Sequence, residues 1–189
     1  MWRRVVIKPP PKNGLYFLTF PDAATAQRIA ALAHQCRREY RLRAPPLLSS
    51  RFHVSLHNVG QYDASGVPET VVLKASDAAT KVKASPFAVM FNRVESFSGR
   101  DGKYPLVLRG DDGVVGLEML NRSLGVSMRM AGLKASLNFT PHLTLSYGER
   151  LITERPIQPI SWTVREFALI HSLYGKTKYI RLGCWPLGA

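Results

Sequence analysis

The chain has 189 residues, of which 46% are hydrophobic and 21% charged, so it can bury a core and is not intrinsically disordered. Its 26 Lys and Arg residues against 13 Asp and Glu residues give a formal net charge of +13. A positive charge of this size favours polyanionic partners, nucleic acid above all; the alternative is a basic surface without a partner.

The sequence also allows a prediction of where in the cell the protein is located. No stretch approaches the length of a membrane span, and the first residues contain no apolar run long enough for a signal peptide. The two cysteines, Cys36 and Cys184, have no metal-binding or redox spacing, which favours reduced thiols. We therefore expect a cytoplasmic protein that does not enter a membrane.

The first half of the chain shows one strong helix between two strands. Residues 1–13, with three consecutive prolines, are expected to form an extended lead-in, and 14–20 has the composition of a strand. Asp22 is placed to cap a helix whose apolar residues fall on one stripe. A strand over 50–60 follows, and then a weaker helix over 68–83.

The second half repeats this order. Strands over 86–98 and 104–110 flank a glycine-rich turn, and Asp111 or Asp112 is placed to cap a helix that stops at Gly132. Three strands are predicted after this helix, over 139–148, 162–173 and 178–187. Since each half runs strand, helix, strand, the pattern predicts one α+β domain over 1–189, built from two similar lobes.

Two tetrapeptides of the pattern His-x-Ser/Thr-Leu stand at equivalent places in the two halves: HVSL from His53 and HLTL from His142. Composition alone rarely produces two copies with the same final leucine. Side chains alternate along a strand, so each copy is predicted to place its polar side chains on one face. These are His53, Ser55 and His57 in the first copy, and His142, Thr144 and Ser146 in the second.

If the two lobes face each other, two imidazoles and two hydroxyls converge on one cleft. Such a cleft suits phosphodiester hydrolysis without a metal, because one neutral imidazole can accept a proton from water while the other donates to the departing ribose oxygen. The hydroxyls can donate hydrogen bonds to the non-bridging oxygens. Two alternatives remain: hydrogen-bonding strand histidines without a catalytic role, or a zinc site of His53, His57 and His142.

On these residues the chain resembles the 2H phosphoesterase superfamily, and within it the LigT-like RNA 2′,3′-cyclic phosphodiesterases, which are also known as 2′-5′ RNA ligases. The resemblance runs from LYFLTFPD through RFHVSLHNVG and FTPHLTLSYG to FALIHSLYGKTKYIRLGCWPL. It implies two pseudo-symmetric lobes of antiparallel sheet with helices packed outside and a central cleft that carries both motifs. It implies catalytic roles, without a metal or cofactor, for His53, Ser55, His142 and Thr144.

The implied reaction is hydrolysis of a terminal 2′,3′-cyclic phosphate of RNA to a 2′-phosphate by a monomer. We expect His142 to activate water and His53 to protonate the 3′-oxygen, although the motifs do not themselves distinguish the two roles. The same residues would serve the joining of RNA ends through a 2′-5′ linkage. The alternatives are a small cyclic or 2′-5′-linked nucleotide as substrate, and a basic RNA-binding module without turnover.

One position departs from the family pattern. Many LigT-like proteins carry His-x-Thr-Leu-x-Arg at the second motif, whereas Tyr147 stands at the place of the arginine here. A guanidinium that holds phosphate is then absent or comes from another part of the chain. Expected substrate contacts are His57, Tyr147, Arg100, Lys103 and Arg109. The alternatives are a rim position for His57, a buried aromatic for Tyr147 and solvated surface positions for the three basic residues.

Overall fold

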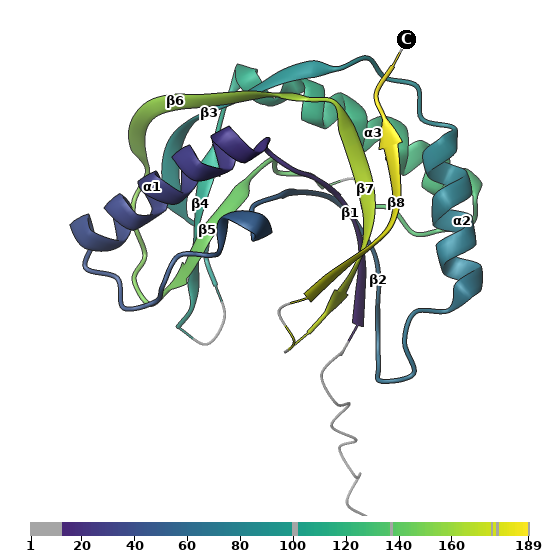
Figure 1. The fold of residues 1–189 in the computed structure, drawn as a ribbon, viewed down its shortest axis with the longest axis horizontal. Helices are drawn as coiled ribbons and strands as arrows, with labels where there is room; N and C mark the ends of the chain where they lie inside the picture. The colour runs from purple at the N-terminus through teal and green to yellow at the C-terminus, as the bar shows by residue number, and fades with distance from the viewer. Residues whose placement is uncertain (1–12, 100–101, 137, 175, 177, 189) are drawn as a thin grey trace, which may run out of the picture.

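The computed structural model describes residues 13–99, 102–136, 138–174, 176 and 178–188, and one antiparallel sheet runs through them (Figure 1). Its strands are β1 (Asn13–Thr19), β2 (Val54–Tyr62), β3 (Phe87–Ser96), β4 (Tyr104–Arg109), β5 (Leu143–Gly148), β6 (Arg155–Val164), β7 (Glu166–Leu173) and β8 (Lys178–Pro186). The helices are α1 (Ala23–Glu39), α2 (Glu69–Thr80) and α3 (Val115–Met130). The predicted α+β class is confirmed. The lead-in over 1–13 lies outside the described residues, except for Asn13.

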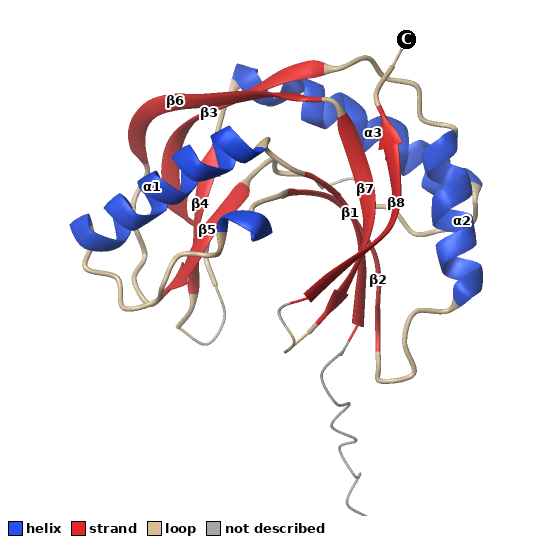
Figure 2. Ribbon diagram, in the orientation of Figure 1, coloured by secondary structure: helices blue, strands red, loops and turns tan. Residues whose placement is uncertain are grey.

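The sheet divides into two lobes that meet between β2 and β5. Its strand order is β6-β3-β4-β5-β2-β1-β7-β8, so each lobe holds four neighbouring strands. A single residue pair, Val54 with Leu143, joins β2 to β5, whereas the pairs within a lobe run over several residues. In Figure 2 the sheet arches, with one lobe on each side of this junction. The predicted two-lobed antiparallel architecture is confirmed.

The helices bury their apolar faces in one core behind the sheet. Ile29 and Cys36 of α1, and Leu117 and Leu124 of α3, belong to the same buried cluster as Val54 at the junction. α1 packs against β5 and β6, α3 packs against β2 and β3, and α2 lies beside α3. Because α1 follows a strand of one lobe and packs on strands of the other, it ties the two lobes together. No described helix is long and apolar enough to cross a membrane.

Two of the predicted helix signals act as expected. The carboxylate of Asp22 accepts a hydrogen bond from the Thr25 backbone N–H at 2.8 Å, which caps the start of α1. Gly132 follows α3 with a positive φ of 75°, and the next N–H donates to the Met128 carbonyl at 2.9 Å. Gly132 thus ends the helix in the left-handed conformation that glycine adopts without strain.

The cap predicted for the second strong helix is wrong. A 3-10 turn over Asp112–Val114 precedes α3, and no described side chain caps the helix. The carboxylate of Asp111 instead forms an ion pair with the guanidinium of Arg93. The sequence shows an acidic residue before the helix but not the arginine on β3 that competes for it.

The single strand predicted over 162–173 is also wrong. The chain breaks at Arg165 into β6, which pairs with β3 at one edge of the sheet, and β7, which pairs with β1 in the other lobe. The sequence does not predict the first part of β6, because this part contains Pro156 and Pro159 and proline is rare in strands. An edge strand tolerates it, since one side of its backbone has no neighbour to bond.

Candidate active site

The two tetrapeptides meet where the lobes join. Val54 and Leu143, the residues that follow the two motif histidines, are antiparallel partners, and both side chains are fully buried. The side chains before and after them therefore lie on the opposite face, which is the cleft face. Continuing the antiparallel register by one residue sets the polar side chains in two cross-strand pairs, His53 with Thr144 and His142 with Ser55.

A β-bulge at the last residue of each motif reverses the faces beyond it. The register of β2 against β1 shifts by one residue at Leu56, and the register of β5 against β4 shifts at Leu145. The extra residue turns the following side chains over. His57 and Ser146 are consequently buried, with 4% and 3% of their surface exposed. The prediction that they share a face with the motif histidines is wrong.

His57 points to α3 and not into the cleft. Its Nε2 lies 2.8 Å from the carbonyl oxygen of Asn121, and its ring packs against Gly125, where an added Cβ would come within 3.1 Å of Nε2. Burial lowers the pKa of His57. The zinc site imagined from His53, His57 and His142 is therefore not formed. Among the described residues, no group of three His, Cys, Asp or Glu side chains could hold a metal ion.

Both motif histidines are held by the same kind of hydrogen bond. Nδ1 of His53 lies 2.7 Å from the carbonyl oxygen of Arg51, and Nδ1 of His142 lies 2.7 Å from that of Thr140. A carbonyl oxygen only accepts, so Nδ1 carries the proton of each neutral ring. Nε2 is then the nitrogen that can exchange a proton with a ligand.

Each motif histidine also packs edge-on against an aromatic ring, and the guanidinium of an arginine lies over the same ring. The ring of His53 lies edge-on to Tyr179 at 5.8 Å, and the Arg51 guanidinium lies 4.2 Å from the Tyr179 centroid. In the other lobe, His142 lies edge-on to Phe97 at 4.9 Å, and the guanidinium of Arg109 lies 5.6 Å from that ring. The pseudo-symmetry of the lobes thus extends to the surroundings of the two imidazoles.

Burial lowers the pKa of both imidazoles. For His53, the hydrogen bond to the Arg51 carbonyl raises the pKa, while the positive charges of Arg51 and of a protonated His142 lower it further. For His142, the Thr140 carbonyl raises the pKa and the charge of Arg109 lowers it. Both rings are therefore neutral near pH 7 in the free protein, and protonation of one opposes protonation of the other.

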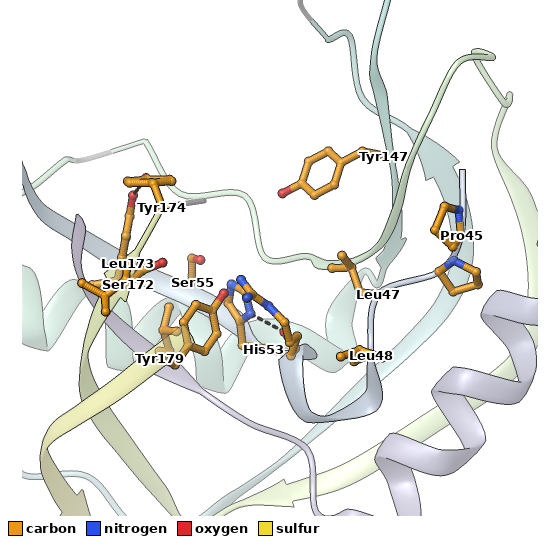
Figure 3. Close-up of a pocket in the computed structure, with 14 residues that line it drawn as sticks. Pro45, Leu47, Leu48, His53, Ser55, Tyr147, Ser172, Leu173, Tyr174 and Tyr179 are labelled. Atoms are coloured by element: carbon orange, nitrogen blue, oxygen red, sulfur yellow. Dashed lines mark hydrogen bonds between the residues drawn. The ribbon is translucent and has the colours of Figure 1, made fainter. Parts of the chain in front are cut away.

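A cavity of about 680 Å³ opens beside His53 (Figure 3). Its wall is partly apolar, from residues 45–48, and otherwise polar or aromatic. In Figure 3 Tyr147 lies across the cavity from Tyr174 and Tyr179. Burial raises the pKa of Tyr147, so its hydroxyl stays protonated and can donate a hydrogen bond. The remaining polar lining includes Arg51, His53, Ser55 and Ser172.

The residues expected to contact substrate are not all at the cleft. Tyr147 lines the cavity, and Arg109 lies beside His142, so their contact with substrate stays a prediction. Lys103 is exposed in the turn before β4 and does not line this cavity. Arg100 lies outside the described residues.

Two cleft residues are missing from the sequence-based set, Arg51 and Tyr179. Arg51 stands two residues before His53 but is the last residue of a 3-10 turn over Ser49–Arg51, so the alternation of side chains along a strand does not place it. Tyr179 comes from β8, which is separated from β2 by two strands. No local pattern relates it to the motif.

Comparison with known proteins identifies a family and a group of structures with a similar fold. The model of the 2′-5′ RNA ligase superfamily matches residues 20–175, which include both motifs. No curated protein matches the chain. Solved structures share its fold at low identity. Apo Escherichia coli LigT has a TM-score of 0.72 and 22% identity, over 95% of this chain and 99% of that one.

Two further structures extend the likeness. The E. coli LigT complex with 3′-AMP has a TM-score of 0.70 and 23% identity, over 95% of this chain and 99% of that one. TT0787 of Thermus thermophilus has a TM-score of 0.68 and 18% identity, over 92% and 97% of the two chains. The family match over most of the chain, both motifs included, settles its membership: this chain belongs to the 2′-5′ RNA ligase superfamily of 2H phosphoesterases.

Proposed function

We propose that this protein is a metal-independent phosphodiesterase that opens the 2′,3′-cyclic phosphate at an RNA end and leaves a 2′-phosphate. The observation that carries the proposal is the pair of imidazoles at the lobe junction, each held through Nδ1 by a backbone carbonyl. Two such rings can supply a base and an acid in one turnover.

In the proposed reaction, Nε2 of His142 accepts a proton from water as the water oxygen attacks phosphorus. Protonated Nε2 of His53 gives its proton to the 3′-oxygen as the bond between phosphorus and that oxygen breaks. The hydroxyls of Ser55 and Thr144 donate hydrogen bonds to the non-bridging oxygens, where negative charge gathers. With a 5′-hydroxyl in place of water, the same residues would join two RNA ends through a 2′-5′ linkage.

Three features support RNA as the substrate. A net charge of +13 attracts a polyanion. The tyrosines that line the cavity offer faces on which a base can stack. E. coli LigT, which shares the fold, has been solved with 3′-AMP, and this favours a nucleotide at the equivalent cleft.

The test is hydrolysis of a short RNA that ends in a 2′,3′-cyclic phosphate, with a chelator present. We expect a 2′-phosphate product, identified by mass and by its sensitivity to phosphatase. His53→Ala and His142→Ala should each abolish turnover while RNA binding persists. His34→Ala is the matched control, because His34 is exposed on α1, away from the cleft.

Other outcomes would contradict the proposal in different ways. Turnover only of small cyclic or 2′-5′-linked nucleotides would keep the chemistry and replace the substrate. If no cyclic phosphate is hydrolysed, while RNA binds with a steep dependence on salt, the protein is a binding module.

A further inference from the structure

The two arginines beside the motif histidines differ in their partners. Nη1 of Arg109 lies 3.4 Å from Oε1 of Glu95, so a carboxylate balances its charge. Among the described residues, no carboxylate lies within ion-pair distance of Arg51. Within the described part of the chain, the guanidinium of Arg109 therefore has a carboxylate partner and the guanidinium of Arg51 has none.

The unneutralised guanidinium faces the cavity. Arg51 is the one cationic side chain among the described residues that line it, where it joins His53 and Ser55. It is only partly exposed, and it lies over the Tyr179 ring at 4.2 Å. Stacking occupies the flat face of a guanidinium and leaves the N–H groups at its edge free to donate.

A partly buried guanidinium without a counter-charge is a binding site for an anion. Its planar set of donors matches two oxygens of a phosphate, and such charge-assisted bonds are stronger than neutral ones. Ser55 and the imidazole of His53, which act on a phosphoryl group in the proposed function, line the same cavity. Tyr147, a neutral hydrogen-bond donor, lies across the cavity from Tyr179, the ring on which Arg51 stacks.

We propose that Arg51 is the residue that binds the phosphoryl group of the substrate, through its guanidinium, on the His53 side of the cleft. This inference rests on the proposed function, because it names a substrate-binding residue of the same site. Arg51 then acts twice: its carbonyl orients His53, and its side chain holds the phosphate. A side-chain substitution removes only the second action, since the carbonyl belongs to the backbone.

The first test measures binding and needs no turnover. Isothermal titration calorimetry with inorganic phosphate and with adenosine 2′-monophosphate would compare the wild type with R51Q and R51K. We expect R51Q to weaken binding of both by about 10- to 100-fold, the usual effect of losing charged hydrogen bonds. R51K keeps the charge but loses the two-pronged geometry, so an intermediate affinity is expected.

The matched control is R181Q. Arg181 also lies over an aromatic ring, Phe20, at 5.6 Å, but it pairs with Glu166 at 3.0 Å and does not line this cavity. R181Q removes one positive charge as R51Q does, so phosphate affinity should stay near that of the wild type. Equal weakening by R181Q and R51Q would overturn the inference, since it would show a general effect of net charge.

Kinetics on the cyclic-phosphate RNA separate this inference from the proposed function. R51Q is expected to raise KM and to lower kcat/KM by about 10- to 100-fold, with an unchanged melting temperature. If the wild type hydrolyses the cyclic-phosphate RNA and R51Q binds phosphate with the wild-type affinity, the role of Arg51 is refuted and the proposed function stands. If the wild type binds phosphate through Arg51 without turnover on any cyclic phosphate, the proposed function is refuted instead. A loss of activity in R51Q and R51K alike, with lower melting temperatures and unchanged phosphate affinity, would mean that Arg51 is structural.

Discussion

At the scale of single residues, the motif histidines depend on the backbone just before them. Each Nδ1 donates to the carbonyl oxygen two residues earlier, with buried Phe52 or Pro141 in between. Because a fixed backbone atom holds each ring, the tautomer and the direction of Nε2 do not rely on another side chain. This geometry has consequences for the pH dependence of activity.

We expect kcat/KM to be bell-shaped in pH, with its optimum on the acid side of about pH 6.5, the ordinary pKa of histidine. Burial lowers the pKa of both His53 and His142, and the active form needs one ring neutral and the other protonated. Initial rates on the cyclic-phosphate RNA, at constant ionic strength, would give the profile. An optimum above neutrality would contradict the acid–base assignment to these two rings.

His57 is expected to matter for stability and not for turnover. His57→Ala removes a buried ring and leaves the Asn121 carbonyl without this partner, so the free energy of unfolding should fall by about 2 to 4 kcal/mol. Urea denaturation measures the loss, and kcat/KM should stay within about threefold of the wild type. His34→Ala, at an exposed position, should change stability by less than about 0.5 kcal/mol. A large loss of kcat/KM with unchanged stability would contradict this prediction and show that His57 takes part in catalysis.

At the scale of elements, the leucine that ends each tetrapeptide is the residue at which the strand bulges. Before the bulge the alternation of faces follows the sequence, and beyond it the faces are exchanged. The bulge in β2 buries His57, and the corresponding bulge in β5 buries Ser146 and brings Tyr147 to the cavity. The repeated position in both lobes indicates that the bulge belongs to the motif and not to one strand.

The end of α3 offers a test of backbone conformation. Gly132 has a φ of 75°, and among the described residues the nearest atom to an added Cβ is Nζ of Lys74 at 4.0 Å. Gly132→Ala should therefore lower the free energy of unfolding by about 1 kcal/mol through conformational strain alone. Gly132→Asn should cost less, because asparagine tolerates this conformation. Thermal and urea denaturation would measure both, and equal losses would argue against this cause.

At the scale of the whole molecule, stability should fall as the pH is lowered. His53, His57 and His142 all have lowered pKa values because they are buried. In the unfolded chain these groups take up protons near about pH 6.5, and in the folded protein only at lower pH. Between those values the unfolded state binds more protons, so stability that is complete above about pH 6.5 is lost on acidification.

Urea midpoints measured across this range would show the effect. The double variant His53→Gln/His142→Gln should lose part of the pH dependence, since two of the three groups no longer titrate. His34→Gln should keep the wild-type dependence, because His34 is exposed. A double variant with the full dependence would show that other groups cause the acid sensitivity.

Local sequence signals are enough to predict the class of the fold, most of the order of its elements, and the pair of motifs that meets at the lobe junction. These rest on local signals, namely periodicity, the Asp22 cap, the stop at Gly132 and a repeated tetrapeptide. Even the meeting of the motifs follows from their equivalent places in two similar lobes.

The register of the strands and the contacts between distant side chains cannot be predicted from such local signals. The bulges that bury His57, the split of 162–173 into β6 and β7, and the approach of Tyr179 to Arg51 all depend on pairing between strands far apart in the chain. Pairing energy is shared between two segments, so neither segment shows it alone. The unneutralised charge of Arg51 is of the same kind, because it depends on which carboxylates the fold brings near and which it keeps away.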